Sequence, residues 1–175
     1  MPSYENMLSA GVHYGRKKTV KHPKMEPFIY ALKDSIHLIN LYKTEEELKA
    51  AAEFLKKDKR VSGVRYPWLT DDPTYGVAKK YLKNGFGGMV VFGIKGGYDA
   101  GVKFINNITL FSHLANVGDA KSLVLHPSST SHSQLSEQQQ RESGLTPDLI
   151  RLSIGLEHPD DIIEALDEGL AISQK

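Results

Sequence analysis

A strand-like run near the end of the sequence, LIRLSIGL at 149–156, contains an arginine in a position suited to anion binding. Four aliphatic residues alternate onto one predicted buried face: Ile150, Leu152, Ile154 and Leu156. Arg151 lies on the opposite face, followed there by the small residues Ser153 and Gly155. Small neighbours leave room beside a guanidinium, which can pair with a carboxylate or phosphate through two hydrogen bonds. The spacing predicts an anion site at Arg151, with pairing to a surface acid as the alternative.

A basic segment near the start of the chain is a second candidate for anion binding. Five basic residues lie within nine positions that contain no acid: Arg16, Lys17, Lys18, Lys21 and Lys24. His13 and His22 stand beside them. Residues 1–60 carry a net charge of +4 and residues 61–175 a net charge of −3. This asymmetry favours a nucleic-acid contact whose affinity depends on salt, and a solvated basic loop is the alternative.

Other patterns give weaker candidates. Lys95, in FGIKGG, could form a Schiff base, but we favour a surface lysine at the end of a strand. The glycines around it do not fit a dinucleotide fingerprint or a P-loop. His126 and His132 lack a third ligand, so no metal site is predicted. The chain has no cysteine, which excludes disulfides, thiolate zinc sites and a cysteine nucleophile.

The elements that position these residues mix strands and helices without a repeat, which predicts an α+β fold. Hydrophobic residues make up 40% of the 175 positions and charged residues 25%, as in ordinary globular proteins. Strands are predicted over 28–32, 36–42, 61–66, 88–94, 110–114, 122–125 and 149–156. Helices are predicted over 6–10, 45–57, 72–82, 98–106, 136–144 and from 159 onward. Two of these helices begin with predicted capping boxes, Thr44 with Glu47 and Ser136 with Gln139.

Residues from about 51 to 175 resemble the C-terminal domain of the pyridoxal-phosphate enzymes of cysteine and methionine metabolism, in particular O-acetylhomoserine sulfhydrylases. The resemblance rests on VRYPWL, AKKYL, GGMVVFGIKGG, LFSHLANVGDAKSLVLHP, SSTSHSQLSEQQQ and LIRLSIGLEHPDDIIEAL. It implies the C-terminal domain of a fold-type-I enzyme, an antiparallel sheet with helices on one side. A helix, basic loop, β-hairpin and helix would precede it. It also implies that Arg151 pairs with the substrate α-carboxylate and that Asn116 borders that carboxylate.

The same resemblance implies pyridoxal phosphate as the cofactor of the complete family enzyme. No segment of this chain matches the family's Schiff-base lysine, phosphate-binding loop, pyridinium-pairing aspartate or ring-stacking tyrosine. We therefore expect no cofactor and no catalytic residue in this chain by itself, and we do not give Lys95 the role of the family lysine. A carboxylate site without the cofactor cannot catalyse elimination or replacement at an amino acid.

Residues from about 7 to 57 resemble the N-terminus of bacterial small-subunit ribosomal protein S-two. The motifs are GVHYGR, HPKM and the run Ile36 to Thr44. Arg16, Lys21 and His22 depart from the family's usual histidine, tryptophan and asparagine. The resemblance implies ribosomal-RNA contacts through the basic loop: His13, Arg16, Lys17, Lys18, Lys21 and Lys24. We place the junction within Ala51–Lys57 and divide the chain into 1–57 and 58–175.

Three hypotheses follow for the function. The first is a fusion or truncated protein that carries the substrate-carboxylate-binding domain of a sulfhydrylase-like enzyme and is inactive by itself. The second is an enzyme subunit completed by a separate cofactor-binding chain, and the third is a ribosomal-RNA-binding fragment. Expected partners are ribosomal RNA, a second copy of the chain or a cofactor domain. No apolar run approaches the ~20 residues that span a bilayer, and no signal peptide is visible, so we expect a cytoplasmic protein.

Overall fold

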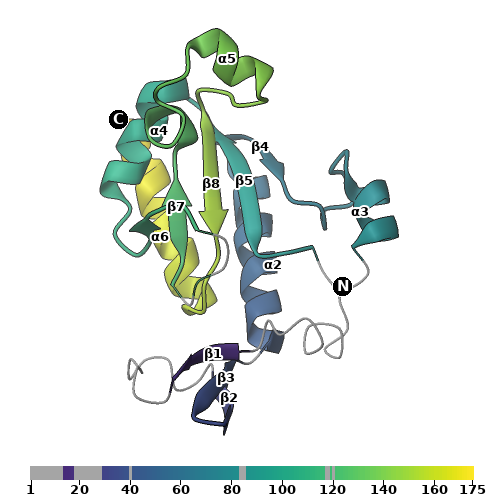
Figure 1. Cartoon of the computed structure of the whole chain (residues 1–175). Coiled ribbons are helices and arrows are strands. Elements are labelled where there is room, and N and C mark those ends of the chain that lie inside the picture. Colours follow the sequence, from purple (N-terminus) through teal and green to yellow (C-terminus); the bar gives the residue numbers. More distant parts are fainter. Residues whose placement is uncertain (1–13, 18–28, 40, 83–85, 117–118, 120) are drawn as a thin grey trace.

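A mixed five-stranded sheet forms the centre of the computed structural model (Figure 1). The structure describes residues 14–17, 29–39, 41–82, 86–116, 119 and 121–175. The strand order is β4-β5-β8-β7-β6. In that order the strands are Val61–Arg65, Met89–Ile94, Leu149–Ser153, Leu123–Leu125 and Ser112–His113. No helix in this described part of the chain is long and apolar enough to span a membrane.

The prediction of an antiparallel sheet is wrong at one edge. Strands β6 and β7 run parallel, whereas the other neighbouring pairs of this sheet are antiparallel. Parallel pairing means that the chain returns, between β6 and β7, to the end of the sheet at which β6 starts. The Ser112 amide then donates to the Ser122 carbonyl at 2.9 Å.

Three helices cover one face of the sheet, here called the helix face. They are α2 (Leu41–Lys57), α4 (Gly97–Asn107) and α6 (Pro159–Ser173). The sheet contributes side chains that are at most 1% exposed: Val90, Phe92, Ile94, Ile150 and Leu152. The helices contribute Leu55, Phe104 and Leu166, each 0% exposed. The core therefore lies between the helices and the sheet, and the predicted buried face of 149–156 is confirmed.

Helix α2 belongs to this core, although it lies in the part of the sequence assigned to the N-terminal resemblance. Leu48, Ala51, Ala52 and Leu55 are buried in the same cluster as the strands, and α2 contacts both α6 and β4. The division of the chain at residue 57 into two homologous parts stays a prediction.

A separate three-stranded sheet precedes α2 (Figure 1). Strands β2 (Ile29–Lys33) and β3 (Ile36–Ile39) are antiparallel, and β1 (Tyr14–Lys17) pairs with the other edge of β3. The connecting residues Asp34 and Ser35 have positive φ angles of 50° and 63°, as a tight two-residue hairpin requires. The predicted hairpin is confirmed, while the predicted helix at 6–10 lies outside the described residues.

One of the two predicted capping boxes forms. Ser136 Oγ accepts from the Gln139 amide at 3.3 Å, and the Gln139 side chain accepts from the Ser136 amide at 2.9 Å, which caps α5 (Glu137–Glu142). The box at Thr44 is wrong as a helix start, because α2 already begins at Leu41 and Thr44 lies inside its first turn. Leu41, Tyr42 and Lys43 contain no helix breaker, so the helix extends back toward the strand.

Two further boundaries differ from the sequence prediction, and one short helix was not predicted. Helix α3 begins at Tyr75 and ends at Tyr81, because the Asp72 side chain accepts from the Thr74 amide at 2.8 Å and holds the preceding residues in a turn. Strand β8 ends at Ser153 rather than at residue 156. Pro127–Ser129 forms a short 3-10 helix, η2.

Candidate carboxylate-binding site

Arg151 lies in β8, the middle strand of the larger sheet. Its neighbours across the sheet are Val91 in β5 and Leu125 in β7. Ile150 and Leu152, on either side of it in sequence, point into the core, so the Arg151 side chain starts from the opposite face, here called the outer face. Arg151 is half-buried there.

The structure brings Arg151 and Asn116 together. Arg151 Nη2 donates to the backbone carbonyl of Asn116 at 2.8 Å, so the contact uses the main chain of Asn116. Asn116 is exposed in the segment that follows β6. Among the described residues no acid forms an ion pair with Arg151, which differs from the alternative of pairing with a surface acid. A guanidinium with one nitrogen held by a carbonyl keeps other N–H groups that can donate to a carboxylate.

A buried network anchors the chain near this site. The Glu157 carboxylate accepts from the Ser122 amide at 2.9 Å and from Ser122 Oγ at 2.8 Å. Ser122 Oγ in turn accepts from the Gly155 amide at 2.8 Å. Ser122 is 0% exposed. These bonds join the segment before β7 to the turn after β8. Asn116 lies a few residues before Ser122 in the sequence, and Arg151 lies a few residues before Gly155.

The expected open space beside Arg151 is not provided by Gly155. A Cβ atom at Gly155 would lie 2.5 Å from the Ser122 nitrogen and 2.6 Å from a Glu157 carboxylate oxygen. Ser153 is 3% exposed. The small residues of LIRLSIGL therefore let another chain segment approach closely, and this correction could not be foreseen without the tertiary packing.

The predicted RNA-binding residues are described only in part. Arg16 and Lys17 lie in β1, which pairs with β3. His13, Lys18, Lys21 and Lys24 lie outside the described residues. The RNA interface stays a prediction.

The described lysines do not fit a Schiff base with pyridoxal phosphate, which needs a desolvated amine. Lys95 is exposed at the end of β5, and its backbone amide donates to the Arg60 carbonyl at 2.8 Å. Every other lysine whose side-chain exposure is described is also exposed, except Lys49, which is half-buried with Nζ 5.8 Å from the centre of the Trp68 ring. The part of the chain that the structure describes therefore offers no lysine suited to that cofactor.

The two histidines considered for a metal have separate environments. His126 is 0% exposed, with Nδ1 2.8 Å from Ser129 Oγ and Nε2 2.8 Å from the Pro147 carbonyl oxygen. Burial lowers the pKa of His126, so the neutral ring is favoured. His132 is exposed. Within the described residues no cluster of three metal-ligating side chains occurs.

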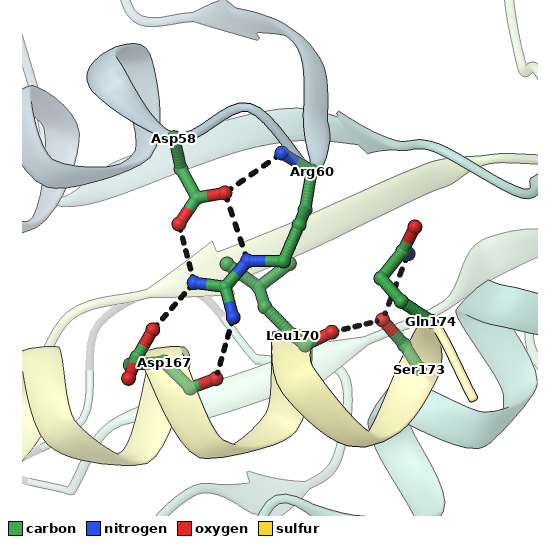
Figure 2. Close-up of polar contacts among 6 residues, drawn as sticks. All are labelled: Asp58, Arg60, Asp167, Leu170, Ser173 and Gln174. Carbon is green, nitrogen blue, oxygen red and sulfur yellow. Dashed lines mark hydrogen bonds and ion pairs between the residues drawn. The ribbon is translucent and has the colours of Figure 1, made fainter.

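Arg60 forms an ion cluster that sequence reasoning missed (Figure 2). Its guanidinium donates to both carboxylate oxygens of Asp58 and to the carboxylate of Asp167 in α6. The hydrogen bond from Arg60 lowers the pKa of Asp58, and the bond to Asp58 raises the pKa of Arg60. The cluster ties the turn before β4 to α6, a structural role. No local signal in the sequence links Arg60 to Asp167, a residue so distant along the chain.

Two family models match the chain. The model described as Cys/Met metabolism PLP-dependent enzyme matches residues 38–171. The model described as Ribosomal protein S2 matches residues 7–63. The two matches overlap in the β3–α2–β4 region, which includes the predicted junction.

Curated relatives agree with the longer of these matches. The O-acetyl-L-homoserine sulfhydrylase of Leptospira meyeri is 52% identical over 120 residues, which cover 68% of this chain and 27% of that protein. O-acetyl-L-homoserine sulfhydrylase 1 of Thermus thermophilus is 47% identical, with 69% and 28% covered. The chain thus spans little more than a quarter of the length of these relatives.

Solved structures share the fold. A Campylobacter jejuni structure described as an O-acetylhomoserine (thiol)-lyase with a pyridoxyl-lysine monophosphate is 39% identical, with a TM-score of 0.68. The alignment covers 74% of this chain and 31% of that one. Cystathionine gamma synthase of Xanthomonas oryzae, solved with cystathionine, is 30% identical, also with a TM-score of 0.68. Here 76% of this chain and 34% of that one are covered.

Proposed function

The chain belongs to the Cys/Met metabolism PLP-dependent enzyme family, and on this premise we propose that it is the substrate-carboxylate-binding domain of a sulfhydrylase-like enzyme. The observation that carries the proposal is Arg151, which starts from the outer face of the central strand and is oriented by the Asn116 carbonyl. The ligand of this site is the α-carboxylate of an amino acid such as O-acetyl-L-homoserine, the compound in the names of the two relatives.

In this proposal the residues of the chain bind and orient, and they transfer no proton. When bound in a complete family enzyme, pyridoxal phosphate supplies the electron sink for chemistry at the amino acid. The described lysines do not fit that group, so we propose that the 175-residue chain is inactive by itself. Arg151 would hold the carboxylate end of the substrate, and the Ser122–Glu157 network would keep the neighbouring segments in place.

The test is a titration of the 175-residue chain with O-acetyl-L-homoserine and with its carboxamide, followed by the amide NMR signals of β8. A charge-assisted hydrogen bond contributes about 1.5–3 kcal/mol, so the carboxylate should bind at least about tenfold more tightly than the carboxamide. Arg151→Gln should remove that preference. Arg141→Gln is the matched control, because Arg141 is exposed in α5, 3.6 Å from Glu137. Equal binding of the two compounds would contradict the proposal.

The cofactor is tested separately by absorbance. Adding pyridoxal phosphate to the chain should give no stable imine band beyond that formed by surface lysines. A band abolished by replacing one particular lysine would show that the chain itself holds the cofactor, against the proposal.

A second candidate function is a subunit that a separate cofactor-binding chain completes. It is favoured by the half-buried side chains Met89, Val91 and Leu149 on the outer face, which a partner could cover. Co-purification with such a chain, and loss of the joint activity in Arg151→Ala, would support it. Joint activity that survives Arg151→Ala would argue against it.

A third candidate function, ribosomal-RNA binding, is favoured by the match of residues 7–63 to the ribosomal family model. Binding to small-subunit RNA should then weaken steeply with salt. Neutralising the basic residues should flatten that dependence: Arg16, Lys17, Lys18, Lys21 and Lys24. An unchanged salt slope after these substitutions would count against RNA binding.

A further inference from the structure

A second arginine, Arg65, lies in the same row of the sheet as Arg151. The register pairs Arg65 of β4 with Val91 of β5, and Val91 with Arg151 of β8. Directly opposed residues of antiparallel strands point to the same face, so all three side chains start from the outer face. Figure 1 shows β4, β5 and β8 side by side in this order.

Arg65 is oriented by a buried carboxylate. Its Nε lies 3.4 Å from Asp72 Oδ2, while the Arg65 side chain is 60% exposed and that of Asp72 is 2% exposed. The other oxygen of Asp72 accepts from the Thr74 amide and hydroxyl. Burial acts to raise the pKa of Asp72, but the bonds from Thr74 and the charge of Arg65 outweigh it and lower the pKa. Asp72 is therefore a fixed anion that holds the base of the Arg65 fork.

The two arginines are built alike. One nitrogen of each guanidinium meets an acceptor of the protein, Asp72 for Arg65 and the Asn116 carbonyl for Arg151. The remaining N–H groups of each fork are left to donate to other acceptors. Because strands are about 4.8 Å apart, the two Cα atoms are separated by about 9.6 Å, and long side chains can bring their ends closer or farther.

The surface between the two arginines is apolar. Val91 lies there and is half-buried. Besides Asp72, which is paired with Arg65, Asp148 lies near this surface: it accepts from Ser62 Oγ at 2.9 Å, and its carboxylate lies over Gly93. Gly93 is two residues from Val91 along β5, about 6.6 Å away. The row therefore has a guanidinium at each end, that of Arg65 paired through Nε with the buried Asp72, and a hydrophobic side chain in the middle.

We infer that this row binds a linear dianion, a molecule with two carboxylates joined by an apolar chain. Resting on the proposed function, one carboxylate pairs with Arg151. The second carboxylate pairs with Arg65, and the methylene groups lie on Val91. Arg65 thereby adds affinity for compounds with a second acidic group, whereas a compound with a neutral end, such as O-acetyl-L-homoserine, is held through Arg151 alone.

The experiment compares butyrate with succinate, adipate and suberate, each titrated into the full 175-residue chain and followed by amide NMR signals of β4, β5 and β8. The best dicarboxylate should bind about tenfold more tightly than butyrate, because its second contact is intramolecular once the first has formed. The chain length of the dicarboxylate that binds most tightly reports the distance between the two guanidinium groups. The advantage should shrink in high salt, since both arginines are partly exposed.

Three variants separate the inference from the proposed function. Arg65→Gln should erase the advantage of the dicarboxylate but not the butyrate-induced shifts of the β8 amides, which report on Arg151, and Arg65→Lys should restore only part of the advantage because the fork is lost. Arg151→Gln should abolish both the advantage and the butyrate-induced shifts of the β8 amides. Arg141→Gln, as control, should change neither.

Each other outcome points to a different failure. A dicarboxylate advantage that is absent, or that survives Arg65→Gln, overturns the dianion inference while the role of Arg151 stands. Butyrate-induced shifts of the β8 amides that survive Arg151→Gln overturn the proposed carboxylate site itself. The melting temperature of each variant is measured alongside, and since Arg65 is exposed at the end of β4 we expect it to stay within a few degrees of the parent.

Discussion

Replacing Ser122 with alanine tests whether the buried network beside the candidate site stabilises the fold. Ser122 Oγ both donates to Glu157 and accepts from the Gly155 amide, each at 2.8 Å. The substitution removes both bonds and leaves the Gly155 N–H without its acceptor in a buried position. The Glu157 carboxylate keeps its contact with the Ser122 amide, so it is not stranded.

The magnitude follows from these bonds. A buried donor left without an acceptor costs about 1–3 kcal/mol, and a hydrogen bond to a charged group is worth about 1.5–3 kcal/mol. Because part of the carboxylate bonding remains, we expect a loss of about 3 kcal/mol in the free energy of unfolding. This is a large part of the roughly 5–15 kcal/mol typical of a folded domain.

The assay is urea denaturation followed by circular dichroism. With a slope of about 2 kcal/mol per M, the midpoint should fall by roughly 1.5 M and the slope should stay the same. Ser133→Ala is the matched control, because exposed Ser133 donates one bond to the Thr130 carbonyl at 2.9 Å. A midpoint for Ser122→Ala no lower than that of Ser133→Ala would refute the reasoning.

Three further predictions concern the core and its charges. Burial keeps His126 neutral, so below about pH 6.5 the unfolded chain binds a proton that the folded chain does not. The free energy of unfolding should therefore fall by up to about 1.4 kcal/mol for each pH unit between about pH 6.5 and the lowered pKa of the folded state. Urea midpoints of the parent and of His126→Gln, measured at about pH 7.5 and about pH 5.5, should show that the variant loses this pH dependence. Leu166→Ala should cost about 2–5 kcal/mol in urea denaturation, since Leu166 is 0% exposed, whereas Leu135→Ala at a 36% exposed position should stay within about 0.5 kcal/mol. Arg60→Gln should cost about 1–3 kcal/mol at neutral pH, because it removes the guanidinium bonds to Asp58, whose side chain is 9% exposed, and leaves that carboxylate only the backbone amide of residue 60. Because the pKa of Asp58 is lowered in the folded state, the parent should keep its whole stability advantage over the variant above about pH 4. The advantage should disappear as the pH falls through the folded pKa of Asp58, and an equal loss of stability at both ends of the pH range would contradict this prediction.

Much of the fold was predictable because its signals are local. Alternation marked β5 and β8, the proline and aliphatic spacing marked α6, and the Ser136–Gln139 box marked α5. The box at Thr44 misled because the residues before it also favour a helix, so local signals placed the start of α2 too late. The parallel pairing of β6 and β7 depends on how a connection folds back, which no local pattern states.

The candidate site divides in the same way. Alternation in LIRLSIGL was enough to put Arg151 on the face opposite the core, because a strand's side chains must alternate. The sequence could also supply the family, through motifs that span the larger part of the chain. It could not tell that Gly155 admits Ser122 and Glu157 instead of a ligand, since that depends on a segment more than thirty residues away in sequence.

What the sequence determined by itself was the kind of element at each position, the polarity of each face and the family resemblance, all of which depend on neighbours along the chain. Only the tertiary structure decided that Arg65 and Arg151 lie in one row across Val91, because strand order and register are set by contacts between segments distant in sequence. The same holds for the partners that orient them, Asp72 and the Asn116 carbonyl. A guanidinium becomes a directed binding group when a fixed acceptor holds one of its nitrogens, and the fold supplies that acceptor.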